Sequence, residues 1–160
     1  MNSKITLDNA GKQLLDKAQR YCATSEQCCS SVQKKLLDWG APLATAGTIV
    51  DMLVDEKYID EARYSEAYID SKVRHQRWGR IKIAYELRLK RIPNAVVTKA
   101  MATIDEEAYA ASLQELTVAK IEALANLEPH QRRSKLNIYL SSRGFTPEEI
   151  SNAINQNLQQ

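Results

Sequence analysis

Basic side chains gather in one short stretch of this 160-residue chain, between residues 72 and 91. Eight lysines and arginines lie there against a single acid, Glu86. They are Lys72, Arg74, Arg77, Arg80, Lys82, Arg88, Lys90 and Arg91. Two aromatic residues, Trp78 and Tyr85, are interleaved with them. Because cations pair with phosphates and aromatic rings stack on bases, this combination is typical of nucleic-acid binding.

The charge is distributed unevenly, although the totals nearly balance at 22 basic and 20 acidic residues. Residues 51–70 carry seven carboxylates against two basic residues, just before the basic stretch begins. Helical spacing also puts Arg80, Arg88 and Arg91 in a sector that overlaps the apolar Ala84 and Leu87. From the residues alone, the basic stretch therefore fits a nucleic acid, an acidic partner or a merely solvated helix face.

No other residues are arranged for chemistry. The five glycines are too dispersed for a phosphate-binding loop, and the two histidines stand alone in the sequence. The odd cysteine count argues against a disulfide framework, and adjacent Cys28 and Cys29 have the wrong spacing for a zinc knuckle. The sequence therefore predicts no catalytic residue, no metal, no cofactor and no enzymatic activity.

The elements that must position the basic stretch are helices. The segment Thr146-Pro147-Glu148-Glu149 is a strong helix start, because it combines a threonine cap, a proline at the first position and a glutamate three residues on. Further N-caps are predicted at Thr24, Asp60 and Asn94. Gly40 and Gly144 suit the left-handed residue that ends a helix. We predict an all-helical protein.

A repeat emerges when Leu36, Leu87 and Leu140 are aligned, at spacings of 51 and 53 residues. Five positions after each leucine come Ala41, Ile92 and Phe145, and ten positions after each come Ala46, Val97 and Ile150. Each repeat reads as a short helix, a tight turn and another short helix. A longer helix is predicted before each pair, over residues 8–23, 60–78 and 106–127.

The sequence thus predicts three tandem three-helix units, which stack into an elongated curved rod because each unit is too small to bury its apolar face alone. The first unit would cover residues 1–58, including an N-terminal extension, the second residues 59–104 and the third residues 105–160. Long concave surfaces of this kind commonly bind macromolecules.

The second unit carries a family resemblance. The run from Glu56 to Tyr64 (EKYIDEARY), followed by Trp78-Gly79, Ile83 and the segment Tyr85–Ile92, resembles the RecX family of bacterial regulators of the RecA recombinase. In that segment Arg91 stands where the family usually has glycine. The turn there must either avoid a left-handed residue or carry modest strain.

The resemblance implies tandem three-helix repeats and a non-enzymatic regulator that binds the RecA–DNA filament. It would inhibit the filament's ATP hydrolysis, strand exchange and repressor cleavage during recombination, DNA repair and the SOS response. We expect the eight basic residues to contact this partner or its DNA. The alternative is a stand-alone DNA-binding protein using the same basic unit. The expected protein is cytoplasmic and monomeric, with no membrane contact.

Overall fold

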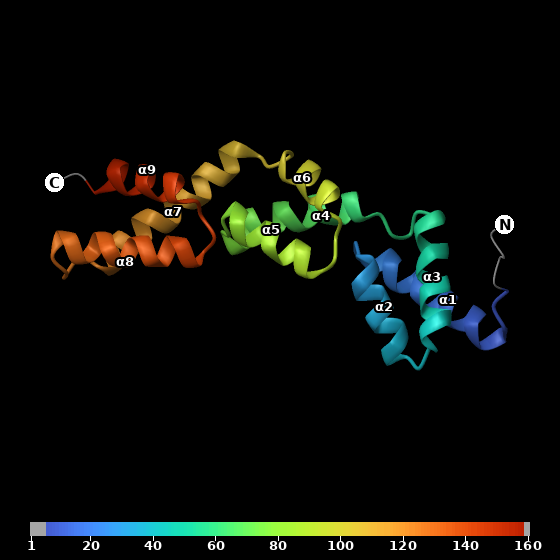
Figure 1. The fold of residues 1–160 in the computed structure, drawn as a ribbon. Helices are drawn as coiled ribbons and strands as arrows, with labels where there is room; N and C mark the ends of the chain where they lie inside the picture. Colours follow the sequence, from blue (N-terminus) through green and yellow to red (C-terminus); the bar gives the residue numbers. More distant parts are fainter. Residues whose placement is uncertain (1–5, 159–160) are drawn as a thin grey trace.

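The computed structural model describes residues 6–158, and every regular element in that range is a helix (Figure 1). The α-helices follow one another in three groups of three along an extended body, with α1–α3 toward one end and α7–α9 toward the other (Figure 1). This confirms the predicted all-helical fold of tandem three-helix units. None of the described helices has the length and apolarity that crossing a membrane requires.

The first unit contains a long helix and a shorter pair. Its helices are α1 (Asn9–Thr24), α2 (Cys29–Asp38) and α3 (Leu43–Asp55). Asp8 caps α1 by accepting a hydrogen bond from the Gly11 amide at 2.7 Å. The predicted N-cap at Thr24 is wrong: Thr24 is the last residue of α1, and Cys28 precedes α2.

The second unit carries the basic stretch. Its elements are α4 (Glu61–Ser71), a π-helical turn η1 (Lys72–Gln76), α5 (Arg80–Leu89) and α6 (Asn94–Met101). Asp60 caps α4, as predicted, by accepting from the Arg63 amide. Pro93, not Asn94, precedes α6, and a proline there supplies a suitable φ without needing a donor.

The predicted single helix over residues 60–78 is also wrong at its end. After Ser71 the chain widens into η1, and Arg77 then adopts a left-handed conformation with φ of 54°. The Trp78 amide donates back to the Lys72 carbonyl at 3.0 Å and closes the wide turn. Ser112 in the third unit donates to the Val73 carbonyl, so contact with another unit satisfies part of this irregular backbone.

The third unit repeats the pattern with α7 (Glu106–Ala123), α8 (Pro129–Ser142) and α9 (Pro147–Asn157). Thr146 and Glu149 form the predicted capping box at the start of α9. The long helix ends at Ala123, four residues before the predicted end, and turns follow as far as Asn126.

The three aligned leucines end the second helix of each unit in the same way. Their carbonyls accept from the amides of Ala41, Ile92 and Phe145, at 2.9, 3.3 and 3.2 Å. The residue before each of these amides has positive φ: Gly40 at 92°, Arg91 at 61° and Gly144 at 96°. The middle turn therefore keeps the left-handed geometry without glycine, at a cost of about 1–2 kcal/mol.

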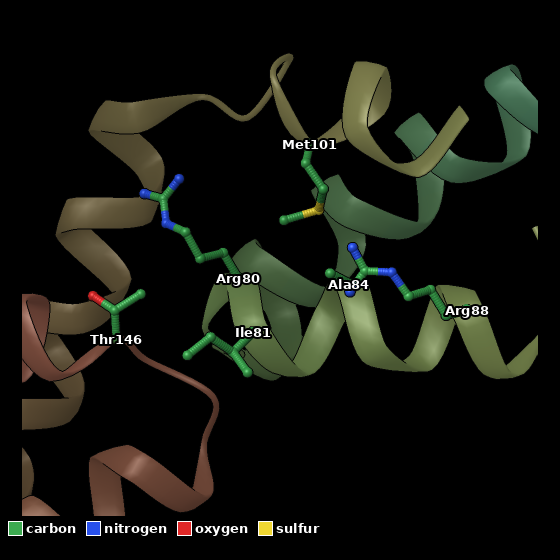
Figure 2. Close-up of a pocket in the computed structure, with 6 residues that line it drawn as sticks. All are labelled: Arg80, Ile81, Ala84, Arg88, Met101 and Thr146. Carbon is green, nitrogen blue, oxygen red and sulfur yellow. The ribbon is translucent and has the colours of Figure 1, made fainter. Parts of the chain in front are cut away.

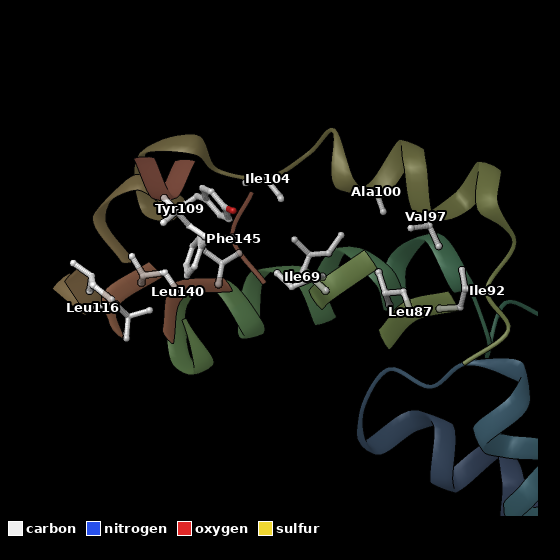
Figure 3. Close-up of a cluster of buried hydrophobic side chains, with 14 of the residues drawn as sticks. Ile69, Leu87, Ile92, Val97, Ala100, Ile104, Tyr109, Leu116, Leu140 and Phe145 are labelled. Atoms are coloured by element: carbon white, nitrogen blue, oxygen red, sulfur yellow. The ribbon is translucent and has the colours of Figure 1, made fainter. Parts of the chain in front are cut away.

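The buried residues form two cores rather than three. One core lies within the first unit and is built around Val32, Leu36, Ile49 and Leu53. The other runs without a break through the second and third units, from Ile69 and Leu87 to Leu140 and Phe145 (Figure 3). The unit boundaries after residues 58 and 104 stay a prediction, since a shared core crosses the second of them.

Candidate partner and nucleic-acid interface

The structure sorts the eight predicted cations of the basic stretch into three environments. Arg74, Arg77 and Arg80 pair with carboxylates, while Lys72, Lys82 and Lys90 lie over aromatic rings. Arg88 and Arg91 have neither kind of partner in the described part of the chain. The stretch is therefore not a single basic patch.

The paired arginines join the second unit to the third. Arg74 binds Asp70, near the end of α4, at 2.7 Å and Asp105, just before α7, at 2.9 Å. Arg77 binds Glu115 of α7 at 2.7 Å. These carboxylates neutralise much of the positive charge that the sequence places in this stretch.

Arg80 is the most enclosed of the three. Its guanidinium binds Glu149 at 3.0 Å and Glu106 at 3.2 Å and lies over the Tyr109 ring, 4.3 Å from the centroid. Burial alone would lower the pKa of Arg80, but the hydrogen bond to Glu106 and the negative charges nearby outweigh it and raise the pKa. Arg80 thus stays charged and serves as a joint between units.

Glu149 completes this joint from the third unit. It accepts from Arg80, from the Tyr109 hydroxyl at 2.8 Å and from the Thr146 amide at 2.9 Å. Burial would raise the pKa of Glu149, but these donors together lower it. A carboxylate with so many donors is fixed in place and ionised at neutral pH.

The three lysines form a different surface with two aromatic rings. Lys72 and Lys82 both lie over Trp78, with their ammonium nitrogens 4.5 and 4.4 Å from the ring centroid. Lys72 also lies 5.2 Å from the ring centroid of Tyr68, and Lys90 lies 5.8 Å from it. We call these five residues the lysine–aromatic face.

Charge on the lysine–aromatic face is held in position but is not neutralised. An aromatic ring attracts a cation through its quadrupole and leaves the net charge unchanged. No carboxylate within residues 6–158 lies within ion-pair distance of Lys72, Lys82 or Lys90. Such lysines can approach a phosphate backbone. Because Trp78 and Tyr68 already hold the lysine side chains in place, those side chains lose less conformational freedom on binding.

Sequence reasoning missed three parts of this arrangement. It placed Trp78 among the cations of the basic stretch, but it expected neither Trp78 nor Tyr68 to hold the lysines; both rings pack on the shared core. It also missed Arg143, which donates to the carbonyls of Gln76 and Arg77 and so secures η1 from the third unit. Trp78 lies between η1 and α5, outside both, so no helical spacing signals its contact with Lys82.

Within the described residues, no three histidine, cysteine or acidic side chains are grouped to hold a metal ion. Cys29 is also poorly suited to act as a nucleophile. Burial, together with the negative charge of Glu61, raises the pKa of its thiol to about 12.

Fold and surface together define a class: an all-helical tandem-repeat protein with a cationic face on its middle unit. A family model described as "RecX, second three-helix domain" matches residues 60–101, which is this middle unit. The middle unit is thus similar to the second domain of RecX proteins.

The relatives extend the match beyond the middle unit. Proteins named "Regulatory protein RecX" from Clostridium tetani and Prosthecochloris aestuarii are each 26% identical, over 87% and 93% of this chain. The aligned region spans 64% of the first relative's length and 96% of the second's. A crystal structure of RecX from Lactobacillus salivarius has a TM-score of 0.82 at 17% identity, covering 94% of this chain and 97% of that one. This last likeness concerns the fold alone.

Proposed function

We propose that this protein regulates the RecA recombinase by binding along the RecA–DNA filament, without catalysing a reaction and without a cofactor. The observation that carries the proposal is the lysine–aromatic face on the middle of a long three-unit body. Similarity to proteins named "Regulatory protein RecX" supports it. The proposed site of action is the bacterial cytoplasm, where the protein acts as a monomer.

The mechanism follows from shape and charge. A long body that spans neighbouring RecA protomers opposes the relative motion that a cycling filament needs. Lys72, Lys82 and Lys90 draw the protein toward the DNA backbone, because each phosphate contact releases condensed counterions. Inhibition of ATP hydrolysis, strand exchange and repressor cleavage would then share one cause.

Arg91 adds a further argument for binding. It is exposed and occupies a left-handed turn position where the two equivalent turns have glycine. Local strain that persists is commonly associated with function. We expect Arg91→Gly to raise the melting temperature while weakening filament binding; weaker binding without added stability would contradict the strain argument.

The experiment that tests the proposal is a titration of RecA ATPase on single-stranded DNA at two salt concentrations. We expect inhibition at sub-stoichiometric ratios of this protein and its loss at the higher salt. The double variant K82E/K90E should lose most of the inhibition. The matched control is K12E/K34E, which changes the net charge equally but lies in the first unit on exposed lysines.

A second candidate function is DNA binding without any partner protein. The unneutralised lysines favour it as well, and it predicts measurable affinity for DNA alone. The logarithm of that affinity should fall linearly with the logarithm of salt concentration, with a slope of about one for each phosphate that the protein neutralises. Binding to bare DNA with no effect on RecA ATPase, even at excess, would select this function over filament regulation.

A further inference from the structure

Helix α5 presents an apolar stripe beside the lysine–aromatic face. Ile81, Tyr85 and Leu89 follow one another at intervals of four and are 52%, 58% and 60% exposed. That spacing puts the three side chains along one line of the helix. We call them the apolar α5 face. Contiguous exposed apolar residues of this kind mark docking sites more often than isolated ones do.

The stripe borders an open hollow of about 320 Å³ between α5, α6 and the start of α9 (Figure 2). The residues lining this hollow are Arg80, Ile81, Ala84, Arg88, Met101 and Thr146. Met101 reaches from α6 toward α5, and the guanidinium of Arg88 is turned back beside Ala84 (Figure 2). The hollow therefore has an apolar floor, with the cation of Arg88 at its edge.

The two arginines of the hollow differ in their availability. Arg80 is already held by Glu106 and Glu149. Arg88 donates from Nε to Asn94 at 3.1 Å and has no carboxylate partner in the described chain. Its terminal nitrogens therefore remain able to bind a carboxylate in the two-pronged geometry that arginine favours.

A nucleic acid would use this surface poorly. A phosphate backbone offers no apolar group for Ile81 and Leu89, and burying them against it would gain little. A protein segment that carries an apolar side chain next to an aspartate or glutamate would satisfy both parts of the site. Its apolar group would fill the hollow, while its carboxylate would bind Arg88.

We propose that the apolar α5 face and Arg88 dock an acidic, apolar segment of the partner protein, while the neighbouring lysine–aromatic face contacts DNA. This inference rests on the proposed function, since it specifies how the regulated filament is recognised. Neighbouring surfaces around α5 would then contact the partner protein and the DNA. Because only the filament offers both ligands, the protein would bind it in preference to bare DNA.

The test compares two measured affinities of the full-length protein. One is for single-stranded DNA alone, and the other is for RecA assembled on the same DNA with a non-hydrolysable ATP analogue. The variant is I81S/Y85S/L89S, whose altered side chains are all at least half exposed. The control is L43S/I138S, which removes apolar groups that are 66% and 71% exposed on other units.

We expect the triple variant to bind the filament about tenfold more weakly, since a few apolar anchors dominate docking energies. Its affinity for bare DNA should stay within about twofold of the parent's, as for surface substitutions away from a binding site. Unchanged filament binding by the folded triple variant would overturn this inference but leave filament regulation intact. Failure of the unaltered protein to bind the filament would instead overturn the proposed function, and this inference with it.

A second measurement keeps the inference testable if the triple variant does not fold. A photo-crosslinking phenylalanine analogue at position 85 should attach to the RecA protein, at a segment with an apolar residue beside a carboxylate. Crosslinking only to DNA, or to a segment that lacks a carboxylate, would refute the docking mode.

Discussion

The junction between the second and third units contrasts with the junction between the first and second. The former combines a shared core, ion pairs through Arg74, Arg77 and Arg80, and direct contact between two glycines. The latter rests mainly on Ser30 donating to the Lys90 carbonyl at 2.7 Å and on the pair between Arg63 and Glu26 at 2.6 Å. Among residues 6–58, only Cys28 is buried in the shared core.

Gly79 and Gly144 make the stronger junction close. The Gly79 amide donates to the Arg143 carbonyl at 2.8 Å, and the Ile81 amide donates to the Gly144 carbonyl at 2.9 Å. A Cβ atom on Gly79 would overlap the backbone of Gly144 and Phe145, and one on Gly144 would overlap Lys82. The start of α5 is thus capped by a turn of the next unit.

The contrast indicates that neighbouring units of a tandem repeat need not be joined equally tightly. The second and third units share one core, which we call the block, and the first unit joins it through a few polar contacts and the buried side chains of Cys28 and Ile59. The lysine–aromatic face lies on the block, so its geometry depends on the third unit more than on the first.

The largest expected effect tests whether the block is cooperative. Phe145→Ala should lower the free energy of unfolding by about 3–5 kcal/mol, because Phe145 is 2% exposed within the shared core. Hydrogen exchange should then rise from α4 through α9 together. The comparison variant Leu36→Ala, expected to cost about 2–5 kcal/mol, should raise exchange only in α1–α3. Exchange confined to α7–α9 in the Phe145 variant would contradict a single block.

The next effect isolates the glycine contact. Gly144→Ala places a side chain at a positive φ and overlaps Lys82, so it should lower the free energy of unfolding by about 2–5 kcal/mol. Gly79→Ala adds the overlap alone and should cost about 1–3 kcal/mol. Chemical denaturation of each variant measures both values.

Two other glycines serve as controls for that series. Gly40→Ala puts a side chain at a positive φ, but its Cβ would meet no described heavy atom beyond the neighbouring residues within 4 Å, so the cost of about 1–2 kcal/mol reports strain alone. Gly47→Ala, inside α3 and also without neighbours within 4 Å, should stabilise the protein by about 0.5–1 kcal/mol. Equal effects at Gly79 and Gly47 would show that the close contact contributes nothing.

The next effect concerns pH. The pKa of Glu149 is lowered in the folded protein, so its carboxylate stabilises the fold above its unfolded pKa of about 4.3 and ceases to do so as pH falls through the folded value. Glu149→Gln should therefore cost about 1–2 kcal/mol at pH 7. The difference from the parent should shrink below about pH 4 in urea unfolding curves.

An exposed ion pair in the first unit provides the matching control. Asp16 and Arg20 lie 3.1 Å apart with side chains 65% and 75% exposed. Asp16→Asn should change stability by less than about 0.5 kcal/mol at either pH. A similar loss from both substitutions would remove the distinction between the joint at Arg80 and an ordinary surface pair.

The sequence predicts the elements of this fold better than their assembly. Leucine spacing located the three equivalent turns, Gly40 and Gly144 specified the geometry of two of them, and Asp60 marked the start of α4, because those preferences act over a few residues. The break at η1 has no such local signal. It depends on Ser112 and Arg143, which come from another unit.

The candidate site shows the same limit. The sequence located the cationic stretch, but an arginine neutralised by Glu115 or Glu149 looks no different along the chain from a lysine that lies over Trp78. Partners more than thirty residues away decide which charges remain available. Only the three-dimensional arrangement separates the joint from the lysine–aromatic face.

The attachment of Arg143 to Gln76, 67 residues earlier in the chain, also has a kinetic consequence. Most helix contacts within a unit join nearby residues and can form early, whereas this one must close a long loop first. Interactions absent from the folding transition state mainly determine how fast a protein unfolds. Loosening this attachment should therefore shorten the lifetime of the native state while leaving the folding rate nearly unchanged.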